Sequence, residues 1–113
     1  MIGVDVVKIQ RIETIAGSER IFTKEEIEYA EKFKNKLEHY AGFFACKEAL
    51  YKALDNKKQT EVKFNEISVC HRDNAAPFFE FLGQTKQVIG EDEFNLSISH
   101  DGEYAIAFVT KKI

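Results

Sequence analysis

The sequence predicts an α+β fold in one domain, residues 1–113, with a mostly antiparallel sheet packed with one long helix and shorter helices. The first observation is an apolar stretch with helical spacing between about Tyr40 and Leu54. The second is a change to period-two alternation after it, which is typical of strands. A chain of 113 residues that is 44% hydrophobic, with ten phenylalanines and one proline, forms one modest core and shows no linker.

The elements before the long helix follow from local signals. Residues 2–9 (IGVDVVKI) are β-branched and predict a strand. Residues 10–17 carry isoleucines at helical spacing and end at a glycine, which predicts a short helix. Thr23, followed three residues later by Glu26, has the pattern of a capping box and begins the next helix.

A polar segment lies on each side of the long helix. The remaining expected strands come after it. Residues 34–39 (KNKLEH) are expected to break the chain before the helix, and residues 55–59 (DNKKQ) to end it. A short helix is expected between two glycines at residues 83–90. An Asp-Gly turn joins the last two strands as a hairpin. The expected strands after the long helix cover residues 62–69, 77–82, 94–100 and 103–110.

Composition excludes several classes of protein. The net charge of −3 gives no support to a nucleic-acid partner bound through a basic surface. No apolar run approaches the roughly 20 residues that cross a membrane, and the N-terminus lacks the pattern of a signal peptide. We therefore expect a cytoplasmic protein in which Cys46 and Cys70 are free, buried thiols.

Two carboxylates stand in otherwise apolar elements. Glu48 projects from an apolar, small-residue face of the long helix, and Lys52 follows it by one turn. An ordinary helix ion pair is the simpler interpretation of these two residues. Asp5 interrupts the valines of the first strand, where it needs a cation, donors or exposure at a strand end. Two such acids suit Mg²⁺, but the spacing alone does not bring them together.

Other polar residues leave their roles open. His100 closes the strand before the last hairpin, where it either contacts a phosphate, acts as a base or caps the turn. The basic residues between 8 and 24 form either a local patch or an ordinary solvated helix face. No Cys/His spacing resembles a zinc site, and no glycine-rich phosphate loop is present.

Five segments in order resemble the bacterial holo-(acyl-carrier-protein) synthases, the short single-domain group of 4′-phosphopantetheinyl transferases. The resemblance runs from the first residue to about Val109, and its most specific part pairs G-x-D near residue 5 with F-x-x-K-E-A-x-x-K-A some forty residues later. It implies the transferase fold, assembling as a homotrimer with sites at subunit interfaces. The segments are IGVDVVKIQRIE, FTKEEIEYA, YAGFFACKEALYKAL, FNEISV and LSISHDGEYAIAFV.

The resemblance also implies an activity. These enzymes move the phosphopantetheine arm of coenzyme A onto a serine of apo-acyl carrier protein, for fatty acid biosynthesis, and release adenosine 3′,5′-bisphosphate. By position, Asp5 and Glu48 match the Mg²⁺ ligands and, with Lys52, the catalytic residues. The serine proton has two candidate acceptors, Glu48 itself or a metal-bound water oriented by Asp5, and the water is favoured because a ligated carboxylate is a weak base.

Further residues are assigned by the same resemblance. It implies coenzyme A binding by Lys47, Lys52 and His100, with His100 near the nucleotide held by a neighbouring subunit. It implies contact with the carrier protein through Arg11, Ile15 and Arg20.

The chain departs from the family pattern around the nucleotide. Relatives often have arginine at the position of Phe43, a glycine-containing loop at residues 54–57 and lysine at Ala76. The sequence leaves open which cation grips the nucleotide instead. The candidates are Lys57, Lys58 and Arg72.

Two alternative functions remain at this point. One is a non-catalytic α+β binding module in which Asp5 and Glu48 form structural ion pairs. The other is a phosphopantetheinyl transferase that serves peptide or polyketide carriers.

Overall fold

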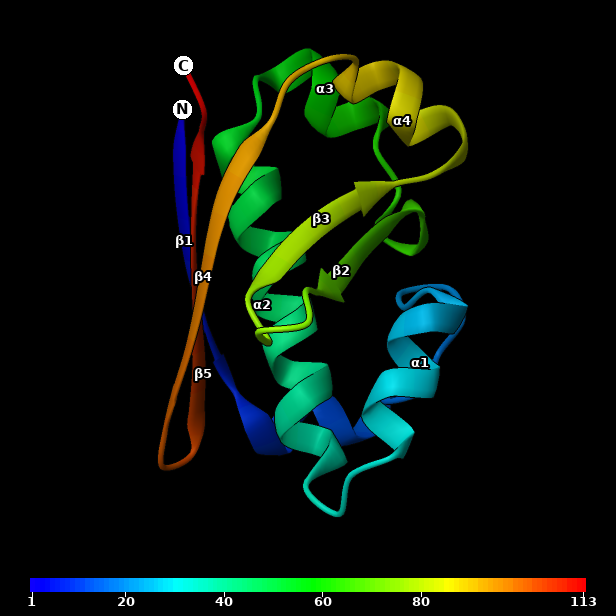
Figure 1. Ribbon diagram of the computed structural model, residues 1–113, viewed down its shortest axis with the longest axis vertical. Helices are drawn as coiled ribbons and strands as arrows, with labels where there is room; N and C mark the ends of the chain where they lie inside the picture. Colours follow the sequence, from blue (N-terminus) through cyan, green and yellow to red (C-terminus); the bar gives the residue numbers. More distant parts are fainter.

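The computed structural model describes residues 1–113 as one α+β unit with five strands, four α-helices and two 3-10 helices (Figure 1). In chain order the elements are β1 (Ile2–Lys8), η1 (Ile9–Thr14), α1 (Lys24–Glu31), α2 (Lys36–Ala53), α3 (Asn56–Glu61), η2 (Phe64–Glu66), β2 (Ile67–His71), β3 (Pro77–Phe81), α4 (Gly83–Ile89), β4 (Phe94–Asp101) and β5 (Tyr104–Lys111).

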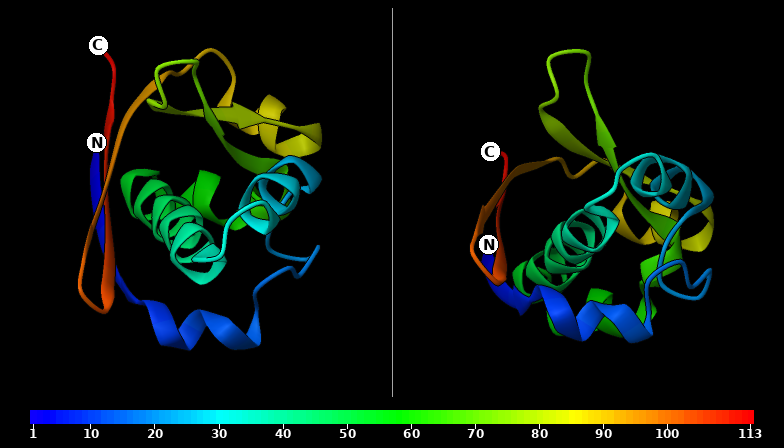
Figure 2. Two further views of the ribbon diagram at one scale, coloured as in Figure 1. Left: turned by 60° about the horizontal axis from the view of Figure 1, so that its bottom comes forward. Right: turned by 90° about the horizontal axis from the view of Figure 1, so that it is seen from below.

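The strands form two antiparallel sheets rather than one. β5 lies between β1 and β4 in a three-stranded sheet, and β2 pairs with β3 in a separate hairpin. Helix α2 packs against β1 and β5 on one face of the larger sheet. The hairpin and α1 lie on the other side of α2 (Figures 1 and 2). The 18-residue helix is therefore covered from several directions.

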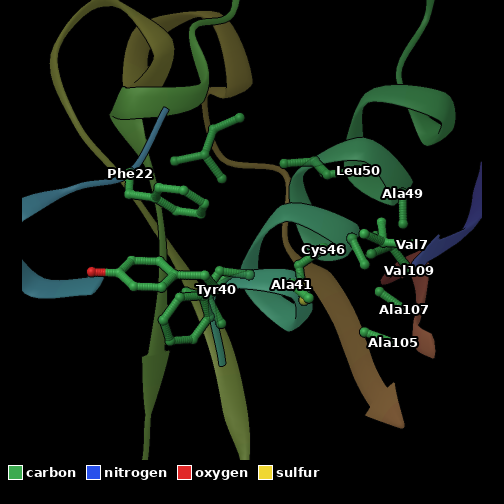
Figure 3. Packing of buried hydrophobic residues seen from close by; sticks show 14 of the residues in the cluster. Val7, Phe22, Tyr40, Ala41, Cys46, Ala49, Leu50, Ala105, Ala107 and Val109 are labelled. Carbon is green, nitrogen blue, oxygen red and sulfur yellow. The ribbon is translucent and has the colours of Figure 1, made fainter. Parts of the chain in front are cut away.

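Small side chains allow α2 to lie close to the larger sheet. Ala49 and Cys46 of α2 point toward Val7, Ala107 and Val109 of the sheet (Figure 3). All five are among the buried residues of the core. Close packing of this kind places one element at a defined distance from the next.

The closest approach between α2 and the sheet is at Gly3 of β1. A Cβ atom at this position would lie 1.8 Å from the carbonyl oxygen of Ala49, so no larger residue fits without movement of the backbone. Alternation along β1 places Asp5 and Val7 on the same face as Gly3. Asp5 therefore faces α2, two residues along β1 from the contact at Gly3.

Several local expectations are confirmed. Oγ1 of Thr23 accepts a hydrogen bond from the amide of Glu26 at 3.2 Å, and the Glu26 carboxylate accepts one from the amide of Thr23 at 2.9 Å, which is a capping box. The Asp-Gly turn joins β4 and β5 as an antiparallel hairpin. Cys46 and Cys70 are both free and buried. None of the helices has the length and apolar character needed to span a bilayer.

Other expected boundaries are wrong. Helix α2 begins at Lys36, because the polar residues before Tyr40 form its first turn instead of a break. Residues 56–61 form helix α3, whose first turn is capped by the Asp55 carboxylate accepting from the amide of Lys58 at 2.9 Å. Residues 64–66, expected as strand, form the 3-10 helix η2. The expected helix at 10–17 is the 3-10 helix η1.

Candidate active site

Asp5 and Lys52 form an ion pair between β1 and α2. The Lys52 ammonium lies 2.9 Å from Oδ1 of Asp5 and also donates to the carbonyl of Val4 at 3.2 Å. The Asp5 side chain is only 14% exposed, whereas that of Lys52 is 52% exposed. The carboxylate is therefore nearly enclosed while its cationic partner remains accessible to a ligand from solvent.

Glu48 is partly buried beside this pair. Asp5 and Glu48 line the same pocket of about 320 Å³, together with Phe44, which lies one helical turn before Glu48. Burial and the negative charge of Asp5 raise the pKa of Glu48, and the charge of Lys52 opposes that effect. None of the ion pairs in the chain includes Glu48. The structure thus brings together two carboxylates that are separated by 43 positions in the sequence, and a lysine is paired with one of them.

The same pocket extends to the expected carrier-binding residues. Arg11 of η1 and Ile15 just after it line the pocket with Asp5 and Glu48. Arg11 is exposed, and Ile15 is partly buried. Arg20 is exposed in the turn before α1 and does not line this pocket. Two of the three residues therefore adjoin the carboxylates, and the third lies outside this pocket.

Lys47 is not placed to bind coenzyme A, contrary to the expectation. Its side chain is completely buried and its ammonium lies 2.7 Å from Oε1 of Glu26. It also donates to the carbonyl oxygens of Phe64 and Ile67. These three partners use the three donors of an ammonium group. Lys47 points into the core because it lies about 100° around α2 from Glu48, on the side that faces α1 and β2.

Glu26 is a structural residue whose importance the sequence analysis underestimated. Besides its bonds to Thr23 and Lys47, its Oε2 accepts from the amide of Val69 at 2.8 Å. Burial raises the pKa of Glu26 and lowers that of Lys47, while the attraction between the two charges opposes both shifts. The pair ties α1, α2 and β2 together. The sequence did contain a signal for a buried charge, because Lys47 stands among apolar residues of α2.

His100 lies in a different pocket from Asp5 and Glu48. Its Nε2 atom is 3.1 Å from the carbonyl oxygen of Glu38, in the first turn of α2. A Cβ at Gly42 would lie 3.2 Å from the same nitrogen, so the glycine leaves room for the imidazole. His39 and His71 line this second pocket with His100. Within one chain, His100 is thus separate from the carboxylates.

Comparison with protein families identifies the chain. A family model described as the 4′-phosphopantetheinyl transferase superfamily matches residues 1–109. The chain belongs to this superfamily. Its similarity to curated members places it in the holo-[acyl-carrier-protein] synthase group of enzymes.

Two members of this group illustrate the similarity in sequence. The holo-[acyl-carrier-protein] synthase of Wolinella succinogenes is 41% identical over 115 residues, which cover 96% of this chain and 94% of that protein. The synthase of Thermoanaerobacter sp. strain X514 is 35% identical over 114 residues, covering 94% of this chain and 82% of that protein.

Solved structures of the group agree with the fold. The Helicobacter pylori holo-[acyl-carrier-protein] synthase in complex with coenzyme A matches with a TM-score of 0.80 and 32% identity, covering 99% of this chain and all of that one. The Bacillus anthracis synthase, in complex with CoA (3′,5′-ADP), matches with a TM-score of 0.76 and 34% identity, covering 96% and 91% of the two chains.

The donor atoms around Asp5 suit a hard divalent cation. No cluster of three or more histidine, cysteine or acidic side chains with metal-binding geometry occurs in the chain. Mg²⁺ is usually held by one or two carboxylates, with water and substrate phosphates completing its oxygen ligands. Asp5 and Glu48 provide such a pair of carboxylates, and Glu48 has no ion-pair partner. The name of the superfamily also describes the transfer of a phosphate-containing group. The residues present therefore fit a magnesium ion.

Proposed function

We propose that the protein transfers the 4′-phosphopantetheine group of coenzyme A to a serine of apo-acyl carrier protein. The reaction depends on Mg²⁺, releases adenosine 3′,5′-bisphosphate and supplies holo-acyl carrier protein for fatty acid biosynthesis in the cytoplasm. The observation that carries the proposal is the pocket shared by Asp5 and Glu48, with Lys52 bound to Asp5 and Arg11 at the same opening.

Asp5 and Glu48 would hold the magnesium ion against the pyrophosphate of coenzyme A. When bound, the ion would supply positive charge that offsets the phosphate charge and so would let a nucleophile approach phosphorus. The half-exposed Lys52 ammonium stabilises the negative charge that develops on the leaving bisphosphate. Because Asp5 already orients Lys52 at 2.9 Å, little reorganisation is needed when the substrate binds.

The serine hydroxyl loses its proton as the new P–O bond forms. We propose two alternative acceptors for that proton: the Glu48 carboxylate, which lines this pocket, and a water molecule that Asp5 would orient. Either acceptor requires the serine to reach the edge of β1 and α2. Phe44 forms an apolar wall of the pocket that limits the access of other water.

The carrier protein would dock beside the same opening. Arg11 and Ile15 line the pocket and offer a cation and an apolar contact to an acidic partner. Arg20, which is exposed in the turn before α1, would provide a second cation for the carrier protein. A carrier protein docked in this way would have its serine next to the carboxylates.

A homotrimer is the assembly that we propose, and the outward face of the larger sheet supports it. Apolar side chains of β1 and β5 meet in register on the face away from α2, for example Val6 opposite Ile106. Val6 is 61% exposed, and a patch of this kind usually marks an interface. The exposed members of the patch are Ile2, Val4, Val6, Tyr104, Ile106 and Phe108.

The position of His100 gives a second reason for assembly. His100 packs against Gly42, which lies six residues and therefore about 120° around α2 from Glu48. A ligand that touches both the carboxylates and a histidine of this kind would take the histidine from a neighbouring subunit.

The transfer is tested by weighing the carrier. Apo-acyl carrier protein is incubated with the enzyme, coenzyme A and Mg²⁺, and its mass is measured. A gain of one phosphopantetheine that disappears with a chelator supports the proposal. No gain at any magnesium concentration would favour the non-catalytic binding module. A much faster reaction with peptide or polyketide carriers than with a fatty-acid carrier would favour the other class of transferase.

A further inference from the structure

The Lys52 ammonium is held by two oxygen atoms of β1. It lies 2.9 Å from Oδ1 of Asp5 and donates to the carbonyl oxygen of Val4 at 3.2 Å. An ammonium group has three donors, and the Lys52 side chain is 52% exposed. One donor therefore remains for an acceptor that arrives from solvent. The other two hold the positive charge beside a carboxylate that is nearly enclosed.

The side chains of this site carry a small net charge. Asp5 and Glu48 line one pocket, and the ammonium of Lys52 lies on Asp5, so the three groups together carry −1. Lys8 and Arg11 line the same pocket, but neither forms an ion pair. Arg11 is exposed and Lys8 is partly exposed, so water and salt screen both charges.

A divalent cation changes this balance differently with and without a diphosphate. The cation alone would bring the net charge of the three groups from −1 to +1, with its charge close to the ammonium of Lys52. Like charges in a partly enclosed pocket repel more strongly than in open water. A diphosphate diester carries two negative charges, so the cation and the diphosphate together leave the net charge at −1. The remaining donor of Lys52 can then bind a phosphate oxygen.

The balance would be different without the lysine. Asp5 and Glu48 alone carry −2, which one divalent cation neutralises completely. Such a pair of carboxylates would attract the cation whether or not a phosphate is present. The position of Lys52 on Asp5 therefore weakens the attraction for a cation alone and preserves it for a cation that arrives with a diphosphate.

We propose that Lys52 makes the binding of Mg²⁺ depend on coenzyme A, because its ammonium on Asp5 opposes the metal alone and stabilises the metal together with the diphosphate. This inference rests on the proposed function. It gives Lys52 a role in the assembly of the site, before any bond changes. By linkage, Mg²⁺ and coenzyme A must each strengthen the binding of the other by the same factor.

Mn²⁺ binding tests this dependence without turnover. Mn²⁺ accepts the same oxygen ligands as Mg²⁺, and the electron paramagnetic resonance of free Mn²⁺ gives the amount that is bound. The full-length protein is titrated with Mn²⁺ in the presence and absence of coenzyme A, without carrier protein. A titration without protein corrects for the Mn²⁺ that coenzyme A itself binds. We expect binding to be on the order of tenfold tighter, or more, when coenzyme A is present.

Lys52→Gln removes the ammonium and keeps a polar side chain. Without coenzyme A, this variant should bind Mn²⁺ on the order of tenfold more tightly than the parent, because the repulsion by the lysine is gone. The gain from adding coenzyme A should shrink by about the same factor. Circular dichroism establishes that the variant is folded. An unchanged or weaker affinity for Mn²⁺ alone in the folded variant would overturn the inference.

Two controls test whether the position of the charge matters. Lys8→Gln removes the same charge from a residue that lines the pocket without an ion-pair partner, and it should change the Mn²⁺ affinity by less than about twofold. Lys52→Arg keeps the charge and should keep the dependence on coenzyme A. An equal gain in Lys8→Gln and Lys52→Gln would mean that the total charge of the pocket controls metal binding, which would also overturn the inference.

Asp5→Asn shows whether Mn²⁺ reports on this site. The variant should lose the Mn²⁺ binding that the parent has with coenzyme A. Absence of that binding in the parent, or its retention in Asp5→Asn, would overturn the proposed magnesium site and this inference together. Tight binding by the parent without coenzyme A, unaffected by Lys52→Gln, would leave the proposed function standing and remove this inference alone.

Discussion

The α-carbon of Gly3 faces the carbonyl of Ala49 so closely that a β-carbon on residue 3 would lie 1.8 Å from its oxygen. This backbone-to-backbone contact sets the distance between β1 and α2. Asp5 follows two residues after Gly3 on the same face of β1, and Glu48 immediately precedes Ala49. The glycine therefore places the carboxylates relative to each other without touching either one.

Gly3→Ala should be strongly destabilising. The added methyl group forces β1 away from α2, and we expect a loss of about 3 kcal/mol or more in the free energy of unfolding, measured by urea denaturation. Gly90→Ala is the matched control, because a Cβ there meets nothing within 4 Å and only the positive φ of 66° is unfavourable. Its cost should be about 1–3 kcal/mol and come from the backbone alone, because φ 66° with ψ −130° is a conformation that favours glycine. Equal losses in the two variants would contradict this account of Gly3.

Asp5→Asn and Glu48→Gln should fold and lose transfer activity. Each change removes one negative charge from the proposed magnesium site, and we expect kcat/KM to fall by a factor of about 10³ or more. The free energy of unfolding should change by about 1 kcal/mol or less, since Lys52 is half exposed. Glu61→Gln, on the exposed surface of α3, is the control. Near-normal activity in either site variant would remove the assignment.

Lys47→Met should be costly for stability because it leaves Glu26 buried without its cation. We expect a loss of about 3–5 kcal/mol, measured by urea denaturation. Glu26→Gln should also destabilise, and the double variant should lose clearly less than the sum of the two. Lys86→Met, at an exposed position of α4, should be nearly neutral. Additive losses would mean that the two residues act independently.

Val6→Lys tests the outward face of the larger sheet. A charge in the centre of this apolar patch should shift the sedimentation of the protein from trimer to monomer, because the interface would have to bury an unpaired ammonium. Transfer activity should fall with it if His100 acts in a neighbouring subunit. Leu82→Lys, at an exposed apolar position outside the patch, should leave assembly intact. A monomeric parent protein at micromolar concentration would exclude the trimer.

The two thiols should be unreactive in the folded protein. Burial and the hydrogen bond to Glu25 raise the pKa of Cys70 to about 12, and burial raises the pKa of Cys46. The thiolate is the reactive form, so at pH 8 labelling of Cys70 should be on the order of a thousandfold slower than that of an ordinary exposed cysteine. Both should react at once in denaturant. Rapid labelling of the native protein would show that this region opens.

Strands were predictable where one face is buried. In β4 the apolar residues Phe94, Leu96 and Ile98 alternate with polar ones because only one side packs on the core. The capping box at Thr23 was equally predictable, because both of its hydrogen bonds join residues three positions apart. Such features depend on neighbours in sequence, so the sequence alone predicts them.

Other features depend on contacts that no local pattern contains. Helix α3 is polar throughout, so it lacks an apolar stripe, although its cap at Asp55 was a usable signal. The first turn of α2 is polar because it is partly solvated. The pairing of Lys47 with Glu26 and the shared pocket of Asp5 and Glu48 both join distant segments. Only the resemblance to a family pointed to the second of these.

Lys47 and Glu48 are neighbours in the chain, but one holds the core together and the other faces the pocket of Asp5. A screen that scores only product formation would report substitutions at both positions as inactive and would class them together. Dividing each rate by the concentration of correctly folded protein separates the two. Without that correction, a survey of this helix would overcount the residues that take part in the reaction.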